Sequence, residues 1–124
     1  MTKLIYLMIG GISGTFARYF LSGVTYKVTG QDFPYGTLAV NVLGCFVMGL
    51  LSSLASKKFL IGEDLKLLLM IGFCGAFTTF STFMLETCNL MKDGENLRAF
   101  FNVAASVVFG FLAFRLGVFL AEIF

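Results

Sequence analysis

The chain has 124 residues, of which 58% are hydrophobic and 13% are charged, and its mean hydropathy is +0.92. This composition is typical of an integral membrane protein and excludes an ordinary soluble domain. The chain has no histidine, which excludes imidazole catalysis and imidazole metal sites, and its nine scattered basic residues leave no footprint for nucleic acid.

Charged residues divide the sequence into four apolar stretches, each long enough to cross a bilayer as a helix. The short connections between them favour an up-down arrangement of antiparallel helices. We therefore predict an all-α membrane protein with a single domain over residues 1–124. Its four transmembrane spans are expected at Leu4–Val24, Phe33–Ser56, Leu67–Cys88 and from Ala99 to the C-terminus.

The first two spans carry small and polar residues within their apolar sequence. In the first span, Gly10 and Gly14 form a small-xxx-small pair, which we interpret as a helix-packing seam. In the second span, Asn41 shares a helical face with Gly44 and Ser52. Asparagine at such a position either bonds across helices or binds a ligand, and the residues alone favour neither role.

The third span has no charge from Leu67 to Leu85, yet its middle reads G-F-C-G-A-F-T-T-F-S-T-F. Glycine and clustered hydroxyl residues sustain a regular helix poorly, and broken helices at membrane depth mark ion or substrate sites. We therefore predict that the third helix is broken at its centre. The break is expected to require unusual backbone angles at Gly75.

Two phenylalanines in this segment, Phe80 and Phe83, lie three residues apart and hence on one helical face. Most of the sixteen phenylalanines are expected to pack in the core or to face lipid. The alternative for these two is that their positive ring edges solvate a small anion in a dry path. Composition does not choose between the two interpretations.

The fourth span contains a second polar stripe, because Asn102, Ser106 and Gly110 follow one another at four-residue spacing. Helix packing is again the alternative, since Ser106 and Gly110 also form a small-xxx-small pair.

The loop charges give almost no signal for orientation. The side that holds both termini carries Lys3, Lys57, Lys58 and Lys66, and the opposite side carries Lys27, Lys92 and Arg98. Positive residues normally mark cytoplasmic loops, so this balance favours a chain that inserts in both orientations and pairs with an inverted copy of itself. An antiparallel homodimer would recreate the inverted symmetry that larger transporters encode as repeats.

Three segments resemble the signature of the Fluc/CrcB family of fluoride channels: Gly10–Tyr19, Gly36–Gly49 and, most specifically, Gly72–Glu86. Their order, their spacing, the four spans and the total length all agree, so the resemblance covers essentially the whole chain. It implies a channel, not an enzyme, that passively exports cytoplasmic fluoride across the cell membrane. It also implies an antiparallel, dual-topology homodimer with two pores along the subunit interface.

The resemblance further implies roles for individual residues. Arg18 would lie toward a vestibule, and the backbone carbonyls of Gly75 and Thr78 would hold a structural Na⁺ at the dimer interface. The pore residues it implies are polar or aromatic side chains of the last three spans: Asn41, Phe80, Ser81, Thr82, Phe83 and Ser106.

Two positions depart from the family pattern. Thr15 stands where alanine is expected, and Asn102 stands where a fourth-span tyrosine is usual, although asparagine can still donate a hydrogen bond.

Two other functions are alternatives to a fluoride channel. One is a small dual-topology multidrug exporter, which would need a first-span glutamate that this chain lacks. The other is a non-transporting membrane assembly subunit.

Overall fold

The computed structural model describes all residues, Met1–Phe124, and contains four helical spans long and apolar enough to cross a membrane. The prediction of an all-α, four-span membrane protein is thus confirmed, with helices that extend beyond most of the predicted bounds. The third span is composed of several segments. The elements are α1 (Thr2–Thr29), α2 (Tyr35–Ser56), α3 (Glu63–Leu65), the π-helix η1 (Lys66–Cys74), α4 (Gly75–Phe77), α5 (Phe80–Lys92) and α6 (Asn96–Ile123).

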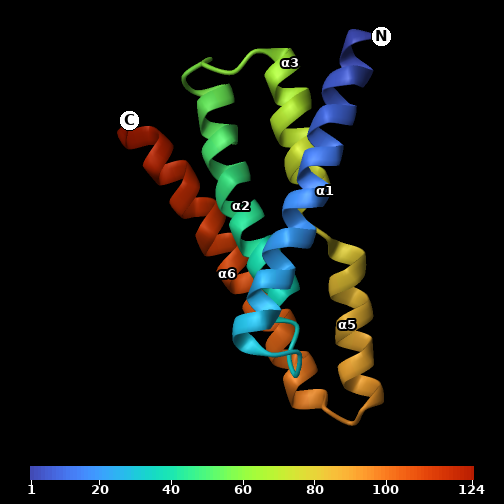
Figure 1. The fold of residues 1–124 in the computed structure, drawn as a ribbon. Coiled ribbons are helices and arrows are strands. Elements are labelled where there is room, and N and C mark those ends of the chain that lie inside the picture. The colour runs from blue at the N-terminus through green and yellow to red at the C-terminus, as the bar shows by residue number, and fades with distance from the viewer.

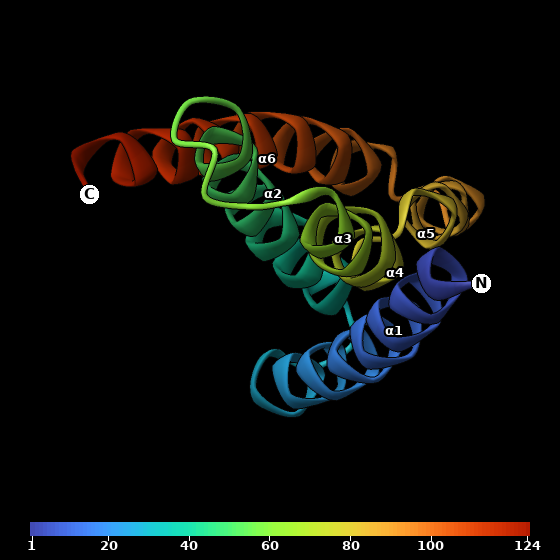
Figure 2. The same cartoon turned by 90° about the horizontal axis from the view of Figure 1, so that it is seen from above.

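The spans run up and down, so that both termini and the connection from α2 to α3 lie at one end of the molecule (Figure 1). The other two connections lie at the opposite end and contain Gly30 and Gly94, the two glycines with positive φ. α2 packs mainly against α6, whereas α1 packs mainly against η1 and less extensively against α2 and α4. α5 is set apart from the other half of the third span, as both views show (Figures 1 and 2).

Glycines bring the backbones of neighbouring helices into direct contact. A Cβ atom on Gly10 would overlap the Leu68 carbonyl oxygen of η1, and one on Gly14 would overlap the Phe73 carbonyl oxygen. The packing interpretation of this pair is therefore confirmed. Without a hydrophobic drive between helices in lipid, such close van der Waals approach is what holds them together.

The contact between α2 and α6 also depends on glycines, and each helix contributes one. A Cβ on Gly49 of α2 would overlap the Phe114 carbonyl oxygen, and a Cβ on Gly117 of α6 would overlap the Phe46 carbonyl oxygen. Each helix thus inserts a glycine against the backbone of the other.

The exterior of the protein is apolar while several polar side chains are buried. Phe111, Leu97 and Phe16 are at least half exposed, whereas Thr37 and Asn102 are buried. This distribution is the reverse of a soluble protein and suits a surface covered by lipid or by another apolar chain.

Candidate functional site

The third span is interrupted between α4 and α5, where Thr78 (φ −84°, ψ 157°) and Thr79 (φ −148°, ψ 110°) are extended. Gly75 instead has ordinary right-handed helical angles (φ −61°, ψ −36°). The predicted break is confirmed, but the expectation of unusual angles at Gly75 is wrong. The break falls on two β-branched residues, whose side chains favour extended backbone.

Asn41 of α2 replaces hydrogen bonds that the break removes. Its Nδ2 donates to the carbonyl oxygen of Thr79 (3.1 Å), and its Oδ1 accepts from the N–H of Thr79 (2.7 Å). Gly44 permits this approach, because a Cβ there would overlap the methyl group of Thr78. Asn41 therefore has the interhelical role that the sequence allowed, satisfying backbone groups that lipid could not.

The break also releases carbonyl groups from their helical partners, among them those of Gly75 and Thr78. In a continuous helix, the N–H of Thr79 would donate to the Gly75 carbonyl and the N–H of Thr82 to the Thr78 carbonyl. Here the Thr79 N–H bonds to Asn41, and the Thr82 N–H donates to Thr79 Oγ1 (3.3 Å). Gly75 and Thr78, the two residues predicted to hold Na⁺, are thus among those whose carbonyls lose a helical donor. Neutral carbonyl oxygens are suitable ligands for such a cation, so these residues fit the ion.

Five of the predicted pore or ion-site residues line one groove of about 270 Å³ beside the break. Its lining consists of Asn41, Cys45, Thr78, Thr79, Phe80, Phe83, Ser106 and Val107. The rings of Phe80 and Phe83 lie 5.8 Å apart on one face, as predicted. Phe83 is 6% exposed and Phe80 is 73% exposed. Ser106 Oγ is buried without a hydrogen-bond partner, so its hydroxyl is free to bind a guest in this groove.

A second pocket, of about 310 Å³, contains Arg18 and Thr82 together with Glu86. Arg18 is half-buried and forms no ion pair with Glu86. The Thr82 hydroxyl accepts a hydrogen bond from the Thr79 hydroxyl (3.0 Å), which leaves its own proton available. The pocket thus combines an unpaired cation with a free hydroxyl donor.

The remaining predicted pore residues are not gathered in one place. Thr82 lies with Arg18 and not in the groove that contains Phe83. Ser81 is exposed and lines neither pocket. Within one chain, the polar and aromatic residues of α5 therefore belong to two different cavities.

Glu86 and Thr37 are site candidates that the sequence reasoning missed. The sequence places Glu86 near a span end, but the structure puts it inside α5, well before the last residue, Lys92. Thr37 Oγ1 donates to Glu86 Oε1 (2.8 Å), while Glu86 Oε2 is buried without a partner. A signal was available, because Glu86 follows Phe83 by three residues and so shares its side of the helix.

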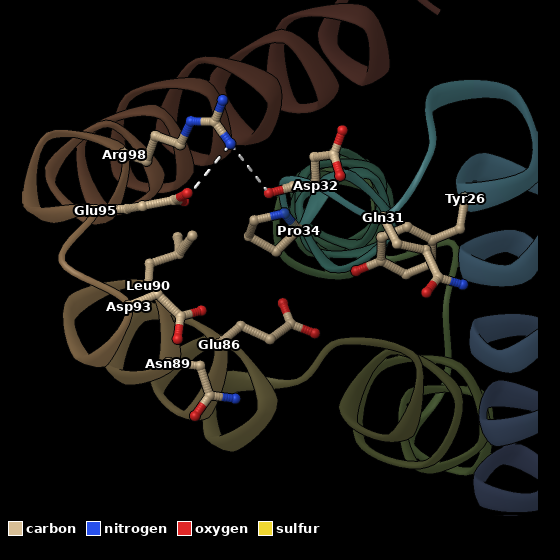
Figure 3. A pocket seen from close by; sticks show the side chains of 10 residues that line it. All are labelled: Tyr26, Gln31, Asp32, Pro34, Glu86, Asn89, Leu90, Asp93, Glu95 and Arg98. Atoms are coloured by element: carbon tan, nitrogen blue, oxygen red, sulfur yellow. Dashed lines mark hydrogen bonds and ion pairs between the residues drawn. The ribbon is translucent and has the colours of Figure 1, made fainter.

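Glu86 also borders a larger polar cavity, of about 610 Å³, at the end of the bundle opposite the termini. Figure 3 shows Arg98 closing one wall, where its guanidinium donates to the Asp32 carbonyl (3.4 Å) and faces Glu95 (3.5 Å). Glu86 and Tyr26 line both this cavity and the Arg18 pocket. The two spaces therefore adjoin, and polar groups lead from this end of the bundle toward the break.

Comparison with known proteins gives one consistent family. The family model described as "CrcB-like protein, Camphor Resistance (CrcB)" matches residues 5–118. Three curated relatives are each named "Fluoride-specific ion channel FluC". The relative from Methylocella silvestris is 48% identical over 115 residues, covering 91% of this chain and 88% of its own. The relative from Solidesulfovibrio magneticus is 41% identical over 123 residues (99% and 98%), and that from Geobacter sulfurreducens is 49% identical over 107 residues (86% and 86%).

Proposed function

The chain belongs to the CrcB family, and we propose that it is a fluoride-selective channel through which cytoplasmic fluoride leaves the cell passively. The observation that carries the proposal is the groove at the helix break, where Asn41, Phe83 and the unpartnered hydroxyl of Ser106 converge. The names of the relatives support the choice of ion. The protein is accordingly a multi-pass protein of the plasma membrane and not an enzyme.

The working unit proposed is an antiparallel, dual-topology homodimer with two pores. A single chain leaves the ring of Phe80 73% exposed beside the groove, so a second surface is needed to enclose the path. The balanced loop charges support insertion in both orientations. An inverted partner would also bring a second helix break to the centre of the assembly.

Conduction would use donors that suit a small, hard anion. The unpaired guanidinium of Arg18 attracts fluoride into the vestibule, and the positive N-terminal end of α5 lies at the break. The hydroxyl of Ser106 and the positive ring edge of Phe83 then replace part of the hydration shell. Chloride is larger and fits such a narrow set of donors poorly.

Export requires no energy coupling in this scheme. Fluoride enters cells as neutral hydrofluoric acid, ionises inside, and is driven out by an inside-negative potential worth about 2.3 kcal/mol per charge per 100 mV.

We also propose a structural Na⁺ at the break, held by the carbonyls of Gly75 and Thr78. Both carbonyls have lost their helical donors, which supports the assignment. The ion would supply a fixed positive charge between the two protomers. Its role is electrostatic and structural, since a hard cation bound only by carbonyls has no redox function.

The deciding experiment is fluoride efflux from liposomes that contain the purified full-length chain, with empty liposomes as the control. Rapid efflux that chloride does not match, and that is independent of a proton gradient, is the expected result. An absence of efflux would favour the assembly subunit, and a strict requirement for a proton gradient would favour the exporter.

The dual-topology part has its own test. In a background with Cys45, Cys74 and Cys88 replaced by alanine, a single cysteine at Lys92 should be labelled from both sides of the membrane. Labelling from one side only would exclude the antiparallel dimer while leaving the choice of ion untouched.

A further inference from the structure

One of the largest fully buried side chains in the protein is polar. Asn102 of α6 is 1% exposed, and its Nδ2 donates to Thr87 Oγ1 of α5 (2.9 Å). This is the one side-chain hydrogen bond between α5 and α6. A buried amide without such a partner would be costly in an apolar setting, so the bond strongly favours one relative placement of the two helices.

The same hydrogen-bond chain continues to the backbone of a proposed pore residue. The Thr87 hydroxyl, 7% exposed, accepts from Asn102 and donates to the carbonyl oxygen of Phe83 (2.8 Å). Its single proton is thus committed and its orientation is set by both neighbours. The chain therefore connects α6 to the residue whose ring borders the groove.

Asn102 itself does not line that groove, although Ser106, one turn further along α6, does. The stripe that the sequence suggested along this helix is consequently divided. Ser106 presents a free hydroxyl to the groove, whereas Asn102 is engaged with α5.

We propose that Asn102 is a positioning residue: acting through Thr87, it sets the rotation and height of α5 so that the Phe83 ring borders the path opposite Ser106. The proposal rests on the pore role assigned to Phe83 above. Asn41 holds only the start of α5 and Thr37 holds it from α2, so the bond from Asn102 is the polar restraint on its α6 side.

The first test removes the bond from either end and measures fluoride efflux of reconstituted, gel-filtered dimers. Asn102→Leu and Thr87→Val keep the approximate side-chain size and lose the hydrogen bond, and each should lower efflux about five- to tenfold. The double variant should be no worse than either single one, and Thr87→Ser, which keeps the hydroxyl, should remain within about twofold of the parent. Parent-like efflux in both single variants, or losses that multiply in the double variant, would overturn the proposal. If Asn102→Leu does not assemble, the comparison of Thr87→Val with Thr87→Ser decides: the proposal requires that only Thr87→Val lowers efflux.

The second test asks whether the effect passes through the Phe83 ring. With Phe83 already replaced by isoleucine, adding Asn102→Leu should cause no further loss of efflux. A purely structural role would add its own loss, and that result would overturn the positioning role. A parent chain that conducts no fluoride, or a Phe83→Ile variant that conducts like the parent, would instead overturn the proposed pore and this inference with it.

Discussion

The two halves of the third span are attached to the rest of the protein in different ways. η1 lies against α1 along a seam in which Gly10 and Gly14 leave no room for a further carbon atom. α5 is held by side-chain hydrogen bonds instead: Asn41 and Thr37 reach it from α2, and Asn102 reaches it from α6.

The two kinds of contact suit different roles: the one at η1 holds the helix in place, and the one at α5 also lies beside the candidate site. A glycine seam packs backbone against backbone, so it holds η1 in place without using polar side chains. Hydrogen-bonded side chains hold α5 at specific atoms and leave other polar atoms free, such as Ser106 Oγ and Glu86 Oε2. The half of the span that contacts its neighbours through polar side chains is therefore the half beside the groove.

The largest expected effect comes from placing a charge at Asn41, whose side chain holds the start of α5. Asn41→Asp should abolish fluoride efflux, because two like charges about 4 Å apart repel by about 4 kcal/mol at an effective dielectric constant near 20, or roughly a thousandfold. The matched control is Asn96→Asp, at the exposed start of α6, which should conduct like the parent. Efflux from Asn41→Asp at the parent rate would mean that the path does not pass Asn41.

The anchor can be tested with two adjacent glycines of α1. Gly10→Ala should lower the free energy of unfolding by about 1–3 kcal/mol, because the new methyl group meets the backbone of η1. Gly11→Ala is the control, since a Cβ there has no neighbour within 4 Å. Thermal unfolding in detergent, followed by circular dichroism, measures both. Equal stability of the two variants would show that the seam is not the anchor.

The aromatic part of the groove should respond less strongly. Phe83→Ile keeps an apolar side chain but removes the positive ring edge, so efflux should fall about tenfold while the proposed dimer still assembles. Phe80→Ile should act in the same direction. Phe119→Ile, near the end of α6 and 57% exposed, should leave efflux unchanged. If all three variants conduct alike, the ring edges do not solvate the ion.

The smallest effect is expected at the break itself. Thr78→Ser keeps the carbonyl proposed to hold Na⁺ and removes only the methyl group that lies over Gly44, so efflux should stay within about twofold. Gly75→Ala should also be mild, since its backbone is helical and a Cβ would meet only the Met70 carbonyl oxygen at 4.0 Å. A severe loss of efflux in Thr78→Ser, which keeps both the carbonyl and the hydroxyl, would show that the methyl contact with Gly44 is required at the break.

Much of the fold could be predicted because membrane-spanning helices are encoded by local composition. Apolar stretches with few charges, separated by short charged loops, predicted four spans, and the pair Gly10/Gly14 predicted a seam. The break at the centre of the third span was also predictable, but the residues whose backbone angles carry it were not. Glycine is the usual marker of a break, yet Gly75 remains helical and Thr78 and Thr79 carry it.

Several residues that line the groove could be named from the sequence, but their arrangement could not be predicted. Asn41, Phe83 and Ser106 converge on one groove. Thr82 and Arg18 lie in a different pocket, because successive residues of a helix point in different directions and the neighbouring helices decide what each one meets. No pattern along the chain predicted the contact between Thr37 and Glu86, which are 49 residues apart.

The sequence by itself determined that this is a four-span membrane protein of the CrcB family with an interrupted third helix, because apolar length, charge spacing and motif are local properties. Only the tertiary structure decided that the amide of Asn41 closes the break, that Asn102 reaches Phe83 through Thr87, and that Ser106 keeps a free hydroxyl. The physical reason is that each of these contacts depends on the distance between two helices and on the rotation of each helix about its axis. That geometry is set by backbone contacts between segments distant in the chain.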